Sequence, residues 1–179
     1  MPSNPKSSGK PLLSIKELAL FAMLGALMYV SKMVLEFLPN VHLLACFIVA
    51  FTRVFRKKAL WIIYTFVFLT GLFNGFGIWW PPYLYLWTLL WAAVMLLPED
   101  LPRKWEPLIY MGIAGLHGLL YGTLYAPYQA IVFGLSFKGM LAWIAAGFPW
   151  DCIHGASNFV VTILAVPIIR ALKRVYATF

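Results

Sequence analysis

The sequence is poor in charge, and this shortage excludes a water-soluble protein. Only 11% of its 179 residues are charged and 63% are hydrophobic, whereas a typical soluble domain has about 25% charged and about 45–50% apolar residues. A chain of this size must cover its core with polar surface if water surrounds it. The mean hydropathy of +0.84 therefore predicts that lipid is the solvent for much of the surface.

Cysteine is also scarce, and the familiar catalytic motifs are missing. Cys46 and Cys152 both lie in apolar stretches, without the spacings of metal sites or disulfide frameworks, so we expect two buried thiols that pack as small hydrophobes. No Walker A, Gly-x-Ser-x-Gly or His-Glu-x-x-His motif occurs, and carboxylates are not paired. We therefore expect no catalytic residues, no metal and no ATPase activity in this chain.

The net charge of +8 raises the question of nucleic-acid binding, but its distribution indicates a membrane topology. Twelve of the fourteen Lys and Arg residues fall into four short clusters between apolar segments. Such clusters are typical of cytoplasmic loops, and no soluble basic face is present. The clusters are Lys6, Lys10 and Lys16; Arg53 to Lys58; Arg103 and Lys104; and Arg170 to Arg174.

The apolar segments predict an all-α bundle of six transmembrane helices. A span needs about 20 apolar residues, and somewhat fewer in a crowded bundle. The segments run from about 15–37, 42–52, 59–73, 81–97, 106–125 and 139–169. The second is short enough to suggest a tilted or partly re-entrant helix. Ala126-Pro127 should interrupt the fifth, and Pro149 should kink the last. Whether 128–138 is a loop or a helical extension stays open.

The basic clusters alternate with loops that hold almost no positive charge, which places both termini in the cytoplasm. An even number of crossings follows, and six fits. A seventh span through 128–146 would put the basic C-terminus outside, so we reject it. The predicted organisation is a cytoplasmic tail over 1–13, without the features of a signal peptide, and a membrane domain over 14–175.

Aromatic and amide side chains collect in the predicted outer loops. They are Asn74, Trp79, Trp80, Tyr83 and Tyr85 in one loop, and Tyr125, Tyr128 and Gln129 in the other. One interpretation is an aromatic belt at the lipid interface. The other is a pocket in which rings stack on a flat ligand and amides orient it. The mixture with Gly, Asn, Gln and Pro favours the pocket, and some rings can serve both purposes.

Polar residues within the spans are the next candidates, because they are expensive in lipid. Asp151, His154 and Asn158 share one face of the last helix. Either Asp151 and His154 pair with each other to make a kinked helix tolerable, or this face lines a ligand cavity. We expect His117 to be a hydrogen-bonding residue in helix packing. Glu36, Asn40 and His42 at the first outer turn are weaker candidates, with a solvated loop as the alternative.

The first helix carries an Ala-x-x-x-Ala pair, Ala22 and Ala26. Small residues at this spacing let helix backbones approach closely in lipid. The pair could pack within the bundle or dock onto another protein.

Together these features resemble a known family, the S components of energy-coupling factor (ECF) transporters. The resemblance covers residues 14–174 and rests on the six-helix pattern, the Ala-x-x-x-Ala helix and the outer loops. Four local stretches are most similar to the branch associated with cobalamin, vitamin B12. They are Leu38-Pro-Asn-Val-His42, Phe68-Leu-Thr-Gly-Leu-Phe-Asn-Gly75, Leu119-Leu-Tyr-Gly-Thr-Leu-Tyr-Ala-Pro127 and His154-Gly-Ala-Ser-Asn158.

The resemblance implies a subunit of the bacterial plasma membrane that binds one vitamin at its extracellular side. It would associate with a transmembrane coupling subunit and two cytoplasmic ATPases, which bind the ATP, and would topple in the membrane to carry the ligand inward. Ala22 and Ala26 would dock the coupling subunit. The outer-loop residues would form the pocket, and Asp151, His154 and Asn158 its floor.

Cobalamin is the first ligand hypothesis, because the four stretches are most similar to that branch. A wide, aromatic and uncharged mouth is compatible with a large, amide-rich corrinoid. Pantothenate, folate or thiamine are the alternatives within transport. A small membrane enzyme or assembly factor acting on lipid is a different class, for which the sequence offers only Asp151 with His154 as ionisable groups.

Overall fold

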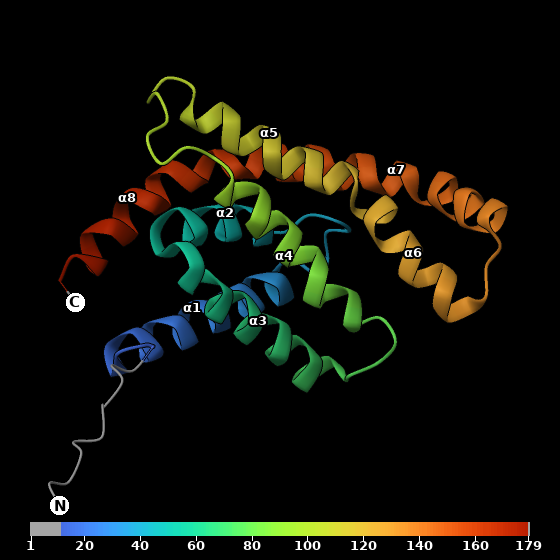
Figure 1. Ribbon diagram of the computed structural model, residues 1–179, viewed down its shortest axis with the longest axis horizontal. Coiled ribbons are helices and arrows are strands. Elements are labelled where there is room, and N and C mark those ends of the chain that lie inside the picture. Colours follow the sequence, from blue (N-terminus) through green and yellow to red (C-terminus); the bar gives the residue numbers. More distant parts are fainter. Residues whose placement is uncertain (1–11, 179) are drawn as a thin grey trace, which may run out of the picture.

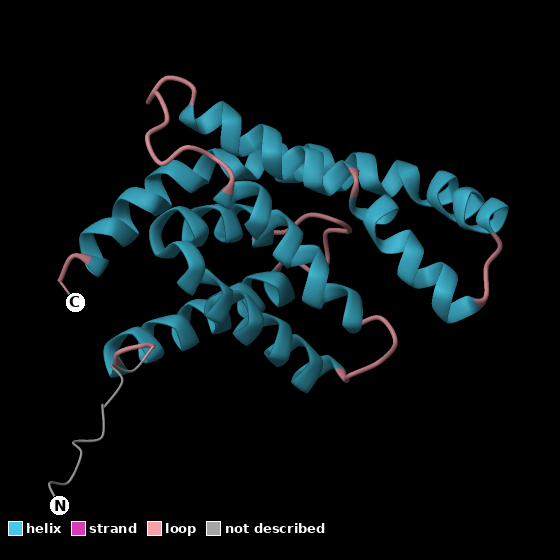
Figure 2. Ribbon diagram, viewed as in Figure 1, coloured by secondary structure: helices cyan, strands magenta, loops and turns pink. Residues whose placement is uncertain are grey.

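The structure of the protein is a computed structural model that describes residues 12–178; these residues form helices joined by loops, with no strand among them (Figure 2). Most of the predicted tail, including Lys6 and Lys10, lies outside the described residues. The helices are α1 Ile15–Val34, α2 Leu44–Phe55, α3 Ala59–Asn74, α4 Pro81–Met95, α5 Glu106–Leu119, α6 Tyr121–Phe133, α7 Phe137–Val161 and α8 Ala165–Tyr176. Two short 3₁₀ turns, Arg56–Lys58 and Thr162–Leu164, lead into α3 and α8.

Three helical segments are long and apolar enough to cross a membrane. They are Ile15–Val34, Glu106–Phe133, which contains α5 and α6, and Phe137–Tyr176, which contains α7 and α8. The helices α2, α3 and α4 are shorter, at 12, 16 and 15 residues. The prediction of an all-α fold with helices long and apolar enough to span a membrane is confirmed for the described residues, whereas six crossings and cytoplasmic termini stay predictions.

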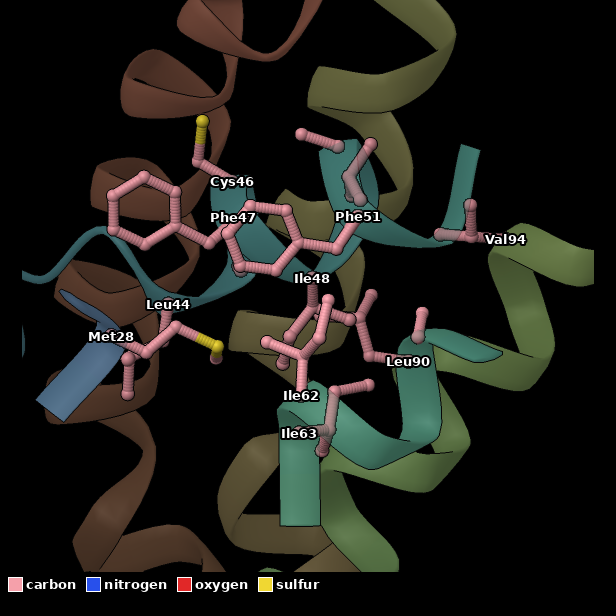
Figure 3. Close-up of a cluster of buried hydrophobic side chains, with 14 of the residues drawn as sticks. Met28, Leu44, Cys46, Phe47, Ile48, Phe51, Ile62, Ile63, Leu90 and Val94 are labelled. Carbon is pink, nitrogen blue, oxygen red and sulfur yellow. The ribbon is translucent and has the colours of Figure 1, made fainter. Parts of the chain in front are cut away.

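The short helix α2 is the centre of the bundle. Every residue from Leu44 to Thr52 is buried, on all sides of the helix. Figure 3 shows Phe47, Ile48 and Phe51 of α2 packed among side chains of its neighbours. Those neighbours are Met28 of α1, Ile62 and Ile63 of α3, and Leu90 and Val94 of α4. A helix enclosed by protein has no lipid thickness to match, which explains how it can be both short and uniformly apolar.

The two cysteines have different environments. Cys46 of α2 is buried in this core, as expected. Cys152 of α7 is exposed, so the prediction of two buried thiols is wrong for Cys152. Its helix packs one face against α5 and α6 and turns the other outward. A chain with lipid as its solvent can leave an apolar side chain on that outer face.

The molecule has two ends of different composition (Figure 1). What we call the basic end contains the start of α1, the α2–α3 turn, the α4–α5 loop and the end of α8. What we call the aromatic end contains the loop 35–43, the α3–α4 loop, α6 and the first half of α7. The most extensive helix–helix contact, between α5 and α7, runs between the two ends.

Several predicted boundaries are shifted. Helix α2 continues through Arg53 to Phe55, and α4 ends at Met95 instead of 97. Helix α7 is continuous through Pro149. The predicted interruption at Ala126-Pro127 is wrong, because the break lies at Leu120 and Pro127 is inside α6.

A contact distant in sequence explains the break at Leu120. The Asp151 carboxylate of α7 accepts the Gly122 backbone N–H, with both oxygens 3.1 Å from the nitrogen. Gly122 lies in the first turn of α6, where backbone N–H groups have no intrahelical acceptor, and α6 has no side-chain cap of its own. Asp151 therefore caps α6 from another helix. Residues 128–133 continue that helix, which ends at Gly134 in the left-handed conformation.

Candidate ligand site at the aromatic end

The first cavity of the aromatic end lies beneath the loop 35–43 and has a volume of about 210 Å³. Three aromatic rings from α4 and α6 face it: Tyr83, Trp87 and Tyr121. Two histidines complete the wall, His42 from the loop and His154 from α7. The remaining lining residues are Lys32, Leu35, Glu36, Leu38, Pro39, Asn40, Val41 and Leu44.

A second cavity of about 280 Å³ adjoins the first and shares Asn40, Tyr121 and His154 with it. It lies between α6 and the first half of α7. Its other lining residues are Gly122, Tyr125, Gln129, Trp143, Gly147, Trp150 and Asp151. The two cavities therefore form one candidate site, divided by the three shared side chains.

The loop 35–43 is held over this site by Asn40. Its backbone adopts a φ of +58°, a left-handed conformation that Asn tolerates better than most residues. Its side-chain Nδ2 donates to the Trp150 carbonyl oxygen at 3.4 Å. The loop is thereby connected to α7 on the far side of the second cavity.

Aromatic and imidazole rings pack against one another at the centre of the site. The ring centroids of His42 and His154 are 4.7 Å apart, and those of Tyr121 and His154 are 4.9 Å apart. Trp87 is within 6.0 Å of His42 and 5.7 Å of Tyr121. Most of these pairs are tilted or edge-on, the arrangements that aromatic rings prefer. A ligand ring entering here would meet side chains already ordered by their neighbours.

Three side chains of the first cavity each carry a buried nitrogen without a hydrogen-bond partner in the part of the chain that the structure describes. They are His42 Nδ1, Trp87 Nε1 and His154 Nε2. More than nine in ten buried polar groups in proteins are hydrogen-bonded, so three exceptions on one wall need an explanation. A bound molecule with acceptor and donor atoms would provide the partners.

No group of three or more His, Cys, Asp or Glu side chains within 12–178 is placed to hold a metal ion. His42 and His154 are a pair without a third ligand nearby, which argues for hydrogen bonding as their chemistry.

Asp151 and His154 do not form the pair that one interpretation of the last helix predicted. The carboxylate is bonded to Gly122, and His154 Nε2 is among the unpartnered atoms. Gly122 has to be glycine, because a Cβ atom there would collide with the same carboxylate. Asp151 is therefore a structural cap whose side chain also borders the second cavity.

The structure brings five of the predicted ligand-binding residues to the two cavities. Tyr83 lines the first, His154 lines both, and Tyr125, Gln129 and Asp151 line the second. Asn158 lies one turn deeper in α7 than His154, buried beside Gly118, and does not line either cavity.

The other predicted residues of the outer loops hold the scaffold together. Asn74 Oδ1 accepts a hydrogen bond from the Tyr29 hydroxyl at 3.2 Å. Trp80, Tyr85 and Tyr128 each donate to a backbone carbonyl of another segment: Val67 at 2.8 Å, Leu124 at 3.1 Å and Ile78 at 2.8 Å. Trp79 packs edge-on against Tyr83. These rings fasten the α3–α4 loop and the α4–α6 contact around the site.

Four aromatic cavity residues escaped the sequence prediction of site residues: Trp87, Tyr121, Trp143 and Trp150. Each lies within an apolar helical run, where an aromatic residue is indistinguishable from a core residue. The weaker candidates Glu36, Asn40 and His42 prove to line the first cavity. His117 is confirmed as a packing residue, since its Nε2–H donates to the Leu86 carbonyl oxygen at 3.0 Å.

The small residues of α1 lie on two faces. Gly25 is buried against α3, where a Cβ atom would lie within 2.7 Å of the Thr65 side chain. Ala22 is exposed and Ala26 is half-buried. The bundle therefore uses Gly25 for its own close packing and leaves the Ala22 face on the outside.

Comparisons of this chain with protein-family models, with curated proteins and with solved structures found no match.

Proposed function

We propose that this protein is the membrane-embedded, substrate-binding subunit of an ECF-type importer, and that it captures a vitamin at the aromatic end. The observation that carries the proposal is the wall of His42, Trp87 and His154, three cavity side chains whose buried nitrogens have no hydrogen-bond partner within residues 12–178. The resemblance described from the sequence supplies the transport context. The aromatic end would face outward, as the distribution of Lys and Arg predicts.

The chemistry of the cavity favours a ring system with several hydrogen-bonding groups. Its walls are aromatic, and its central polar groups are imidazole and indole nitrogens. Two charged side chains of opposite sign also line the cavity: Lys32, in the last turn of α1, and Glu36, in the loop 35–43. A ligand with rings would stack on the aromatic walls while its amide or hydroxyl groups met the nitrogens.

The size of the site bears on which vitamin is bound. Neither cavity alone, at about 210 and 280 Å³, reaches the roughly 300 Å³ at which ordinary small-molecule sites begin. A ligand would occupy both. Cobalamin comes first on sequence resemblance, whereas these volumes favour a smaller vitamin. Thiamine, which has two rings to stack on the aromatic walls, is the second candidate, because pantothenate has no ring.

The face of α1 around Ala22 is proposed to dock the transmembrane coupling subunit, which would bring two cytoplasmic ATPases. Ala22 is exposed and small, so another helix can approach the α1 backbone there. Neighbouring exposed side chains on α1, such as Leu18, give that contact an apolar border.

An enzyme acting on lipid is the less favoured alternative. It would need a free acid–base pair, and Asp151 is committed to the Gly122 N–H. The carboxylate caps a helix, and it forms no hydrogen bond or ion pair with His154 that could relay a proton.

Calorimetric titration of the purified protein with vitamins, including cyanocobalamin, tests the ligand. We expect submicromolar affinity for one vitamin, and His154→Leu should weaken it at least tenfold, which corresponds to about 1.4 kcal/mol. Tight binding of pantothenate or thiamine, but not of a corrinoid, would refute cobalamin and keep the importer. Absence of binding by every vitamin, with no ATPase complex co-purifying from cells, would refute both.

A tryptophan on α1 tests the docking face separately. Ala22→Trp should abolish vitamin uptake by cells and leave the affinity of the purified subunit unchanged. Leu27→Trp is the matched control, because Leu27 is also exposed on α1 but lies roughly 140° around the helix from Ala22. Reduced affinity in Ala22→Trp, or equal loss of uptake in both variants, would contradict the assignment.

A further inference from the structure

A cavity of about 390 Å³ at the basic end lies between the start of α5 and the face of α8. Arg103 and Glu106 line it from the α5 side, and Arg170 and Lys173 from α8. Its floor consists of two buried apolar side chains of α8, Val166 and Ile169. The cavity therefore combines a positively charged rim with an apolar base.

The three cations of this rim lack a partner in the described part of the chain. Within residues 12–178, no hydrogen bond or ion pair engages the side chains of Arg103, Arg170 or Lys173. The single carboxylate, Glu106, is partly engaged elsewhere, since its Oε1 accepts the Tyr110 hydroxyl at 2.9 Å. Three positive charges beside one carboxylate leave the cavity with a net attraction for anions.

A neighbouring cavity of about 240 Å³ shows what a basic cavity looks like when the protein itself provides the partners. This neighbouring cavity shares Lys173 with the cavity between α5 and α8, and its other lining residues are Arg53, Arg56, Glu99 and Asp100. Arg53 donates to the carbonyl oxygens of Pro98 at 2.9 Å and Glu99 at 2.6 Å. Arg56 forms an ion pair with the Glu99 carboxylate at 3.6 Å. In this neighbouring cavity Arg53 and Arg56 fasten the α4–α5 loop, although the buried Arg56 Nη1 has no partner within residues 12–178.

The surroundings of the larger cavity are those of a membrane interface. Trp105, half exposed directly before α5, carries the Lys104 ammonium 5.5 Å from its ring, an arrangement typical of residues at the headgroup level. Leu108 on α5 and Leu164 just before α8 are exposed apolar side chains that lie farther from the basic end along the bundle. An anion in the cavity would therefore have water on one side and hydrocarbon on the other.

We propose that this cavity binds the phosphate of an anionic phospholipid, with Arg103, Arg170 and Lys173 around the headgroup and the acyl chains passing over Val166 and Ile169. Basic pockets between helices at a membrane surface bind such headgroups, whose negative charge the three unpartnered cations would neutralise. The apolar floor favours a lipid over free phosphate, because inorganic phosphate has no apolar part to cover it. The site is independent of the proposed transport function.

Native mass spectrometry of the full chain in neutral detergent tests this proposal. The probes are phosphatidylglycerol and phosphatidylcholine with identical acyl chains, and inorganic phosphate alone. One phosphatidylglycerol should be retained in preference to phosphatidylcholine, and added salt should reduce the difference. Arg170→Gln and Lys173→Gln should each lower retention of phosphatidylglycerol about fivefold.

Arg174→Gln is the matched control, because Arg174 is exposed on the same helix but does not line the cavity. It should retain phosphatidylglycerol as the wild type does. Arg103→Gln, on the opposite wall, gives a second variant on a different element, and all variants are first compared by thermal unfolding. Equal retention of the two lipids, equal losses in Arg174→Gln and Arg170→Gln, or binding of inorganic phosphate without preference between lipids would each overturn the proposal.

Discussion

The basic and aromatic ends differ in what their polar side chains contact. At the basic end, Glu17 of α1 accepts hydrogen bonds from Lys58, in the α2–α3 turn, at 2.6 Å and from Tyr176 of α8. The same carboxylate completes a capping box with Ser14. At the aromatic end, His42, Trp87 and His154 keep unpartnered buried nitrogens around a cavity.

Within residues 12–178, the cavities of the basic end hold one buried side-chain atom without a partner, Arg56 Nη1, whereas the first cavity of the aromatic end holds three. This difference favours a stabilising role for the basic end and a binding role for the aromatic end. The Glu17 cluster joins three segments that are distant in sequence, so its hydrogen bonds count toward folding. Unpartnered buried polar groups destabilise the fold by comparison, and proteins keep such groups where function requires them. The comparison predicts opposite consequences for substitutions at the two ends.

The largest effect is expected where α5 and α7 approach most closely. A Cβ atom on Gly118 would lie 2.7 Å from Asn158 Nδ2 and 2.9 Å from the Gly155 Cα atom. Gly118→Leu should therefore separate the helices beneath the candidate site and destabilise the protein by about 3 kcal/mol or more. Thermal unfolding in detergent measures the loss, and vitamin binding should disappear with it.

Gly112→Leu is the control on the same helix. A Cβ atom on Gly112 meets nothing within 4 Å, so this variant should be neutral or slightly more stable, because leucine is the better helix former. Equal midpoints for the two variants would show that α5 and α7 are not in close contact at Gly118.

A smaller effect is expected at the basic end. Glu17→Gln removes the charged acceptor of Lys58 and Tyr176 and should destabilise the fold by about 1–2 kcal/mol, a value discounted for the partial exposure of Lys58. Glu99→Gln, which removes an exposed partner of Arg56, should change stability by less than about 0.5 kcal/mol. Vitamin affinity should stay unchanged in both. A loss of affinity in Glu17→Gln would contradict the separation of the two ends.

The Glu17 substitution also has a predicted pH dependence. The hydrogen bond from Lys58 to the Glu17 carboxylate raises the pKa of Lys58 above its ordinary value of 10.5. A raised folded-state pKa stabilises the protein below the ordinary value, and this contribution is lost as the pH rises through the folded-state pKa. The stability difference between wild type and Glu17→Gln should therefore be constant from about pH 7 to 9 and narrow above about pH 10.5.

The smallest effect on stability is expected for two buried histidines of the same region, His117 and His154. His117→Leu removes the bond to the Leu86 carbonyl and should destabilise the protein by about 0.6–1 kcal/mol. His154→Leu removes a side chain whose Nε2 has no partner and should leave stability unchanged or raise it, while vitamin affinity falls. Both values come from thermal unfolding and titration of the same preparations. A destabilised His154→Leu with normal affinity would place His154 in the scaffold.

Much of the fold could be predicted from local sequence patterns, and each wrong prediction has a particular physical cause. The start of α4 at Pro81 and of α5 at Glu106 follow from proline in the first turn. The break at Leu120 could not be predicted, because the group that caps α6 is Asp151, on another helix. The same contact removed Asp151 from the pairing with His154 that their spacing suggested.

The candidate site was predicted in part for a similar reason. Tyr83 and His154 were predicted and line the first cavity. Tyr85 and Tyr128 lie in similar stretches of sequence, but their hydroxyls donate to backbone carbonyls instead. Their role depends on which helix lies opposite, and one sequence contains no information on that neighbour.

The sequence alone predicts apolar helices long enough to span a membrane, which the structure contains, and an orientation of the chain in that membrane. Its few charges, long apolar segments and clustered Lys and Arg follow from the cost of placing charge in lipid, which every segment meets individually. Which polar groups acquire hydrogen-bond partners depends, in contrast, on how the helices pack together. Glu17 meets Lys58 and Tyr176, and Asp151 meets Gly122, whereas His42, Trp87 and His154 gather around a cavity unpaired. Hydrogen bonds act over about 3 Å, so their partners exist only after helices far apart in the chain have packed together.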